Sequence, residues 1–184
     1  DLPRMEDAWR AAFPTDPPAR TVLPATAFGA LGGIIEINQI AVRTGAASRK
    51  EVVRAPCPVP IGHASPAVRA GDLVFLSGLF AADAGGLIPA ARLDPGFPYA
   101  GSSIRAQTAF ILDQAEALCR AAGLGLDAIA RQQLFYGDLR EFDASFREVA
   151  ARFGDGMPAT SVVQVPGMAV PGCGVTMDMW AVRA

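Results

Sequence analysis

The stretch Leu73-Val74-Phe75-Leu76-Ser77-Gly78 places four apolar residues in a row directly before a small polar turn. A short apolar run bounded by turn residues is typical of a buried strand. Upstream, residues 51–57 and 66–70 have the pattern of a strand hairpin. Downstream, residues 84–101 are rich in Gly, Pro and Ala, which predicts a loop.

A long amphipathic helix is predicted from about Ser103, because its apolar residues share one face and Gly123 provides a stop. That face carries Ile104, Ile111, Leu112, Ala115, Leu118 and Cys119. The other predicted elements are a strand at 127–137, a helix at 141–153, and strands at 160–166 and 172–183. The order β-β-β-α-β-α-β-β is most simply buried as an α+β domain, with one mixed sheet and two helices on one face.

The start of the chain repeats its end. Met5, Trp9, Ala12 and Phe13 correspond to Phe142, Phe146, Val149 and Ala150, and both sets have the spacing of an apolar helix face. Ala41-Val42-Arg43 matches Ala181-Val182-Arg183 in the same way. Two unrelated amphipathic helices, each followed by two strands, would be the alternative. The shared order, spacing and closing tripeptide favour a repeat.

The repeat predicts two units. Residues 1–46 form the C-terminal half of a first copy, with a helix at 4–14 and strands at 20–26 and 33–43. Residues 44–50 form a linker, and residues 51–184 form a complete second copy. Half a copy has too little sheet to be stable alone, so we expect an upstream or second polypeptide to complete it.

Bulk properties narrow the class of protein. The chain has 184 residues and a net charge of -2, so nothing suggests a nucleic-acid partner. No apolar run is long enough to span a membrane, and the start at Asp1 has no signal-peptide pattern and no initiator Met. We therefore expect a cytoplasmic protein, and a processed or trimmed chain.

Cysteine and histidine are scarce. The three cysteines, Cys57, Cys119 and Cys173, are too scattered for a disulfide framework or a zinc site, and their odd number fits a reducing compartment. His63 is the only histidine, which disfavours a histidine-based metal site or a Ser-His-Asp triad. No metal is expected.

Several local strings resemble the reactive-intermediate deaminase (Rid, YjgF-like) family. They are Gly62-His63-Ala64-Ser65-Pro66, the strand ending Ser77-Gly78, Pro18-Ala19-Arg20-Thr21, and Ile35-Glu36-Ile37 through Ile40-Ala41-Val42. The resemblance implies a chorismate-mutase-like, YjgF-like domain that assembles as a trimeric or pseudo-trimeric barrel with clefts between subunits. It also implies hydrolysis of enamines or imines of small 2-amino acids, without metal or organic cofactor.

The resemblance also implies site residues. Arg20 would hold the substrate carboxylate, because a guanidinium donates two parallel hydrogen bonds to it. Glu36, expected on a neighbouring strand, would handle the water and the proton. Ser77 and the Gly78 backbone would form a pocket wall across an interface, and His63 would replace a missing pocket tyrosine.

The complete copy departs from the family pattern. Thr160 and Thr176 stand where the family has its arginine and glutamate, and Ala64 stands where it usually has tyrosine. The leading hypothesis is a deaminase-like hydrolase of a small carboxylate. One alternative is a non-catalytic ligand-binding or scaffold member with degenerate sites. Another is a hydrolase of a different small or aromatic carboxylate on the same fold.

Overall fold

A seven-stranded mixed sheet is the centre of the structure, a computed structural model that describes residues 2–26, 31–43, 45, 48–58, 60–97, 99 and 101–183. Its strands are β1 (Lys50–Val53), β2 (Ala67–Ala70), β3 (Leu73–Leu76), β4 (Leu79–Phe80), β7 (Ile129–Tyr136), β8 (Ala159–Gln164) and β9 (Val175–Val182). The order is β1-β2-β3-β9-β7-β8, and β4 also pairs with β9. Only β7 and β8 run parallel; the other pairs are antiparallel.

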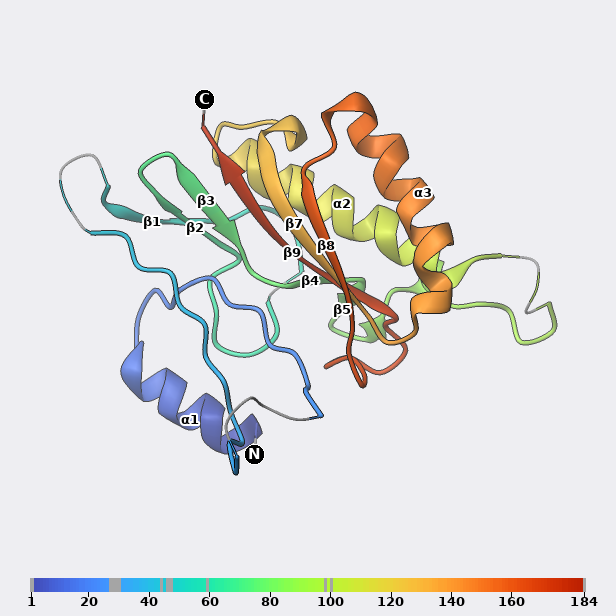
Figure 1. The fold of residues 1–184 in the computed structure, drawn as a ribbon, viewed down its shortest axis with the longest axis horizontal. Helices are drawn as coiled ribbons and strands as arrows, with labels where there is room; N and C mark the ends of the chain where they lie inside the picture. The colour runs from blue at the N-terminus through green and yellow to red at the C-terminus, as the bar shows by residue number, and fades with distance from the viewer. Residues whose placement is uncertain are drawn as a thin grey trace.

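The α-helices of the described residues are α1 (Leu2–Ala12), α2 (Ser103–Ala121) and α3 (Phe142–Phe153). Figure 1 shows α2 and α3 side by side on one face of the sheet, whereas α1 lies apart from them at the lower left of the view. Short elements fill the connections: the hairpin β5 (Ala82–Asp83) and β6 (Gly86–Leu87), and the 3₁₀ turns Pro89–Ala91, Leu126–Ala128, Leu139–Glu141 and Gly154–Gly156. The predicted α+β class, with two helices on one face, is confirmed.

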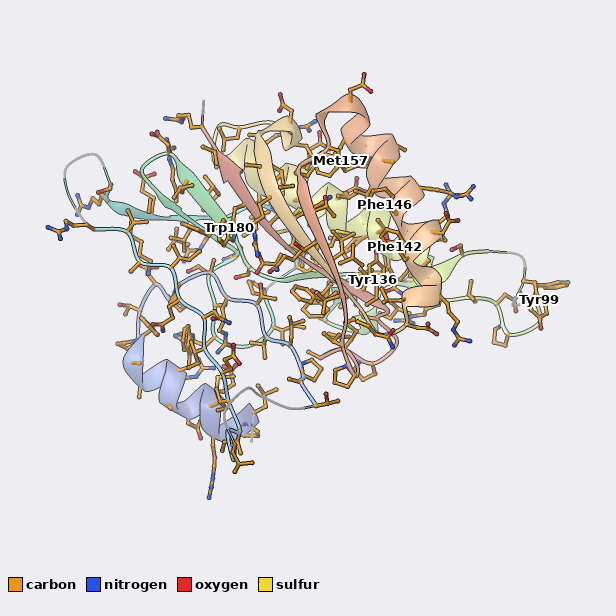
Figure 2. The ribbon with its side chains drawn as sticks, in the orientation of Figure 1. Tyr99, Tyr136, Phe142, Phe146, Met157 and Trp180 are labelled. Atoms are coloured by element: carbon orange, nitrogen blue, oxygen red, sulfur yellow. The ribbon has the colours of Figure 1, made fainter. Side chains whose placement is uncertain are left out.

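The core lies between the sheet and these two helices. Leu112 and Leu118 of α2 and Met177 and Met179 of β9 are fully buried, because alternate residues of a strand point to the same face. Tyr136 is also fully buried, and its hydroxyl donates to Ser145 Oγ at 2.8 Å. Figure 2 shows Tyr136 beside Phe142 and Phe146, whose rings stack 5.0 Å apart where α3 meets the sheet.

The elements of residues 51–183 follow the prediction closely, and those of residues 2–43 only in part. The helix expected at 4–14 forms as α1, but residues 20–26 and 33–43 are not in strands. The prediction of two strands there is wrong for this structure. A strand needs a neighbour to accept its backbone hydrogen bonds. Residues 31–41 are instead exposed, and Figure 1 shows them as an extended trace that leads toward β1.

Two connecting segments were also predicted, a loop and a linker. The loop expected at 84–101 contains strand β6 and the first 3₁₀ turn. The linker expected at 44–50 falls partly on residues 44, 46 and 47, which lie outside the described residues. No described helix is both long enough and apolar enough to pass through a lipid bilayer.

Candidate functional site

The segment after α1 lies against the complete copy at the end of β3. The Ser65 N–H donates to the Pro18 carbonyl at 3.2 Å, and the Ser65 hydroxyl donates to the Pro17 carbonyl at 2.5 Å. The Arg20 N–H donates to Ser77 Oγ at 2.9 Å, and the Gly78 N–H donates to the Arg20 carbonyl at 3.2 Å. These backbone hydrogen bonds of the segment therefore go to residues 65–78 and not to a sheet of its own.

Two glycines make this close approach possible. A Cβ added at Gly78 would lie 2.9 Å from Thr21 Cγ2. A Cβ added at Gly62 would lie 2.5 Å from both Arg20 Nη2 and Glu6 Oε1, and Gly62 also has a φ of +74°, which side chains rarely tolerate. A side chain at either position would therefore have to displace Thr21, or Arg20 and Glu6, and at Gly62 it would also strain the backbone.

The Arg20 guanidinium is the centre of the site. Its side chain is only 8% exposed, and Nη2 forms an ion pair with Glu6 Oε1. Nη1 donates to Met5 Sδ at 3.5 Å, and the guanidinium carbon lies 5.0 Å from the centre of the Trp9 ring, which is cation–π geometry. Nε is buried and has no acceptor among the residues that the structure describes. One N–H of the buried cation is therefore left for another partner.

The carboxylate of Glu6 joins the helix to the turn before β2. Its Oε2 accepts from the His63 N–H at 3.0 Å, while Oε1 accepts from Arg20. Burial raises the pKa of Glu6, but the hydrogen bonds from His63 and Arg20 and the nearby charges of Arg20 and Arg10 outweigh it. The net pKa lies below the ordinary value, so Glu6 is ionised at neutral pH.

His63 is held on several sides by the N-terminal unit. The Trp9 Nε1–H donates to the His63 carbonyl at 2.9 Å. The ring nitrogen Nε2 lies 2.6 Å from the Phe13 carbonyl, and Nδ1 lies 3.2 Å from Arg10 Nη1. A neutral ring with its proton on Nε2 satisfies both contacts, because Nδ1 then accepts from arginine. His63 therefore connects α1 to the complete copy.

The structure gathers Arg20, His63, Ser77 and Gly78, four of the five site residues that the sequence predicted. Glu36 is not brought to them: it is exposed, and its Oε1 accepts from the Asn38 side chain at 3.3 Å. The prediction that Glu36 shares a cleft with Arg20 is not met in this structure, because residues 33–43 have no strand partner.

Sequence reasoning missed the partners of Arg20. These are Glu6, Met5 and Trp9. One feature of the sequence could have identified Glu6. This carboxylate follows Met5 and lies three positions before Trp9, so it borders the apolar face of the predicted helix. Such a carboxylate needs a cation nearby.

The equivalent positions in the complete copy are structural. Thr160 accepts from Gln132 Nε2 at 2.9 Å, and its hydroxyl donates to the Pro158 carbonyl at 2.8 Å. Thr176 is fully buried, and its hydroxyl donates to the Leu79 carbonyl at 2.9 Å. The strands that carry them, β8 and β9, are not neighbours, because both pair with β7, one on each side.

The cysteines are poor candidates for nucleophiles. Burial raises the pKa of Cys173 to about 11, so the thiol stays protonated at neutral pH. Burial also raises the pKa of Cys57, which lines a small hollow that includes Gly78. Within the described ranges, no three His, Cys, Asp or Glu side chains gather as metal ligands.

The sequence profile of the endoribonuclease L-PSP family matches residues 55–183. The chain belongs to this family. A RutC family protein of Pyrococcus horikoshii is 30% identical over 113 residues, which are 59% of this chain and 78% of that protein. The chloroplastic reactive intermediate deaminase A of Arabidopsis thaliana is 29% identical over 121 residues, 65% of this chain and 59% of that protein.

A solved structure has the same fold. The E. coli YjgF gene product superposes with a TM-score of 0.59 at 24% identity, over 72% of this chain and 98% of that chain. The profile match covers residues 55–183 and leaves residues 1–54 outside. The chain therefore has the YjgF-like fold in this region.

Proposed function

We propose that this family member is a Rid-type hydrolase of small imines or enamines that carry a carboxylate, acting in the cytoplasm without metal or organic cofactor. The observation that carries the proposal is the buried Arg20 guanidinium with one N–H unpaired, set beside Ser77 and Gly78. A buried arginine with a free N–H suits a carboxylate, which accepts two parallel hydrogen bonds from the planar fork. The Arabidopsis relative is named a reactive intermediate deaminase, which supports the same reaction class.

Glu36 is proposed to orient water and carry the proton once residues 33–43 are paired in a sheet. In the complete copy the corresponding strands, β8 and β9, lie on either side of β7. Strands are about 4.8 Å apart, so backbones two strands apart are about 10 Å apart. Water would add to the C=N carbon, and ammonia would leave after proton transfer.

The chain organisation is a second part of the proposal. Residues 1–46 are the closing part of one Rid-like domain, and residues 51–184 are a second, complete domain. The unpaired segment supports this, because Ile34, Ile35 and Ile37 are 70%, 45% and 57% exposed and lack the cover that β9 has in the complete copy. We propose that a polypeptide with the β-β-β-α-β order of residues 51–137 covers them, upstream or as a second subunit. Paired domains would then form a trimer or pseudo-trimer.

The proposed chain organisation is tested separately, by mass spectrometry of the protein purified from its natural source. Denaturing spectra should show a longer precursor or a second polypeptide, and native spectra should show an oligomer. A single 184-residue species that is folded and monomeric would contradict it.

A ligand-binding role without catalysis is the second candidate. It is favoured by Glu36, which is exposed and apart from Arg20, and by the threonines at the equivalent positions of the complete copy. An ammonia-release assay with freshly generated 2-iminobutyrate separates the two. The hydrolase proposal predicts release well above the spontaneous rate. Carboxylate binding without faster release would leave the ligand-binding role, and turnover of a carboxylate without ammonia would indicate a different hydrolase.

A further inference from the structure

The Arg20 guanidinium already binds a carboxylate, that of Glu6. We propose that Glu6 is a specificity-determining residue, which occupies Arg20 in the unliganded protein and is displaced when a substrate carboxylate binds. This rests on the proposed function, in which Arg20 is the carboxylate anchor.

The hydrogen bonds of Arg20 show why a ligand carboxylate would compete with Glu6. Glu6 binds only one guanidinium nitrogen, Nη2, while its other oxygen faces the His63 N–H. Nη1 faces a thioether, a weak acceptor, and Nε has no acceptor among the described residues. A bidentate carboxylate needs two adjacent N–H groups, and the Nε edge of the guanidinium shares Nη2 with Glu6. A ligand carboxylate on this edge satisfies Nε, but it then shares Nη2 with Glu6, and the two like charges lie side by side on one nitrogen, which favours the departure of Glu6.

The surroundings of Glu6 allow it to leave. Helix α1 has no fully buried residue, and the Glu6 side chain is 20% exposed, so a turn of the side chain brings the carboxylate into water. The helix stays attached, because Trp9 still donates to the His63 carbonyl. A ligand anion that accepts only one hydrogen bond from Arg20 merely replaces the bond that Glu6 already makes, so it has no advantage over Glu6. The site therefore favours ligands whose carboxylate forms the full fork.

Calorimetric titration of the 184-residue protein with 2-oxobutanoate tests the proposal. Glu6→Gln removes the competing charge, and it should tighten binding about tenfold, equivalent to about 1.4 kcal/mol. Asp7→Asn is the matched control, because Asp7 is an exposed carboxylate on the same helix, and its affinity should equal that of the unmodified protein. The uncharged 2-oxobutanamide should show no tightening in Glu6→Gln, because it cannot replace a carboxylate on Arg20.

The remaining outcomes separate this inference from the proposed function. If Arg20→Lys binds 2-oxobutanoate as tightly as the unmodified protein, Arg20 is not the anchor and both fail. A second outcome is that Arg20→Lys loses binding, while Glu6→Gln binds 2-oxobutanoate as tightly as the unmodified protein or more weakly. Only the displacement of Glu6 then fails, and the role of Glu6 is to position the arginine. NMR of the Arg20 Nε–H in the unmodified protein provides a readout that does not depend on the variants folding. Titration with 2-oxobutanoate should shift that signal, and an unchanged signal, or no binding at all, would overturn the inference.

Discussion

The backbone N–H of Arg20 donates to the hydroxyl oxygen of Ser77, at 2.9 Å and across 57 positions of the sequence. The same hydroxyl donates to the Ser65 carbonyl at 2.6 Å, and the Gly78 N–H returns a bond to the Arg20 carbonyl. One buried serine therefore links the N-terminal unit to two parts of the complete copy.

Ser77→Ala should destabilise the protein by about 1–3 kcal/mol, the cost of leaving partly buried hydrogen-bonding groups unpaired. The variant leaves the Arg20 N–H and the Ser65 carbonyl without their partner. Urea unfolding measures the change. Ser161→Ala on the exposed edge strand β8 is the control and should be close to neutral. Equal effects of the two variants would mean that the junction adds nothing to stability.

Gly62→Ala should disturb the site by more than backbone strain alone. The added Cβ would lie 2.5 Å from Arg20 Nη2 and Glu6 Oε1. Gly86→Ala is the matched control, because Gly86 also has a positive φ, +92°, but nothing lies within 4 Å of its added Cβ. Each should lose about 1 kcal/mol or more from the left-handed backbone. Only Gly62→Ala should also weaken carboxylate binding, and equal binding in both would contradict the close packing at Gly62.

Arg20→Lys should weaken carboxylate binding by about 2–3 kcal/mol, because lysine keeps the charge but loses the planar fork. Calorimetry with 2-oxobutanoate gives the affinity, and ammonia release gives turnover. Folding is checked by the thermal unfolding midpoint, since the variant also alters the contacts with Glu6 and Trp9. Unchanged affinity and turnover would remove Arg20 from the site.

Glu36→Gln should keep carboxylate binding but lower turnover by roughly 10²-fold, the size expected of a general acid–base group. Glu36 is exposed in this structure, so the variant should not destabilise the fold. Thr160→Ala and Thr176→Ala are the control variants at the equivalent positions of residues 51–184. Their turnover, normalised to the amount of folded protein, should be nearly unchanged. Normal turnover in Glu36→Gln would make Glu36 structural, and a large catalytic loss in either threonine variant would place the site in the other copy.

The stabilisation due to Glu6 should depend on pH. Its pKa in the folded protein lies below the ordinary value, so its contribution is present above the ordinary glutamate pKa of about 4.3 and is lost as the pH falls through the folded value. The difference in unfolding free energy between the unmodified protein and Glu6→Gln should therefore be constant near neutral pH and shrink in acid. Urea unfolding at several pH values measures it. A difference that grows in acid would contradict the assigned pKa direction.

Local patterns in the sequence were enough to predict the main helices and strands of residues 51–183. The apolar run at Leu73–Leu76 became the buried strand β3, and the apolar face from Ile104 to Cys119 became the buried side of α2. These elements form where their own residues have the required period and a partner is present in the same chain. The match at Pro18-Ala19-Arg20-Thr21 directed attention to Arg20, whose side chain is buried and paired with Glu6, while its role in a site stays a prediction.

Long-range relationships were not readable from local patterns. Residues 33–43 have a strand-like composition, yet they stay unpaired, because strand formation depends on a neighbour. The separation of β8 from β9 by β7 follows from the parallel pairing of β7 with β8, which spacing alone does not encode. The ion pair of Glu6 with Arg20 arises only when α1 and the segment after it both lie against Gly62.

The most direct test of the central claim is a crystal structure of the protein with 2-oxobutanoate bound. The account predicts the ligand carboxylate on the Arg20 guanidinium, with N–H···O distances of about 2.7–2.9 Å for the charge-assisted bonds. It also predicts Glu6 turned away from Nη2 toward solvent. A ligand bound elsewhere, or an Arg20–Glu6 pair left intact beside bound ligand, would contradict the account.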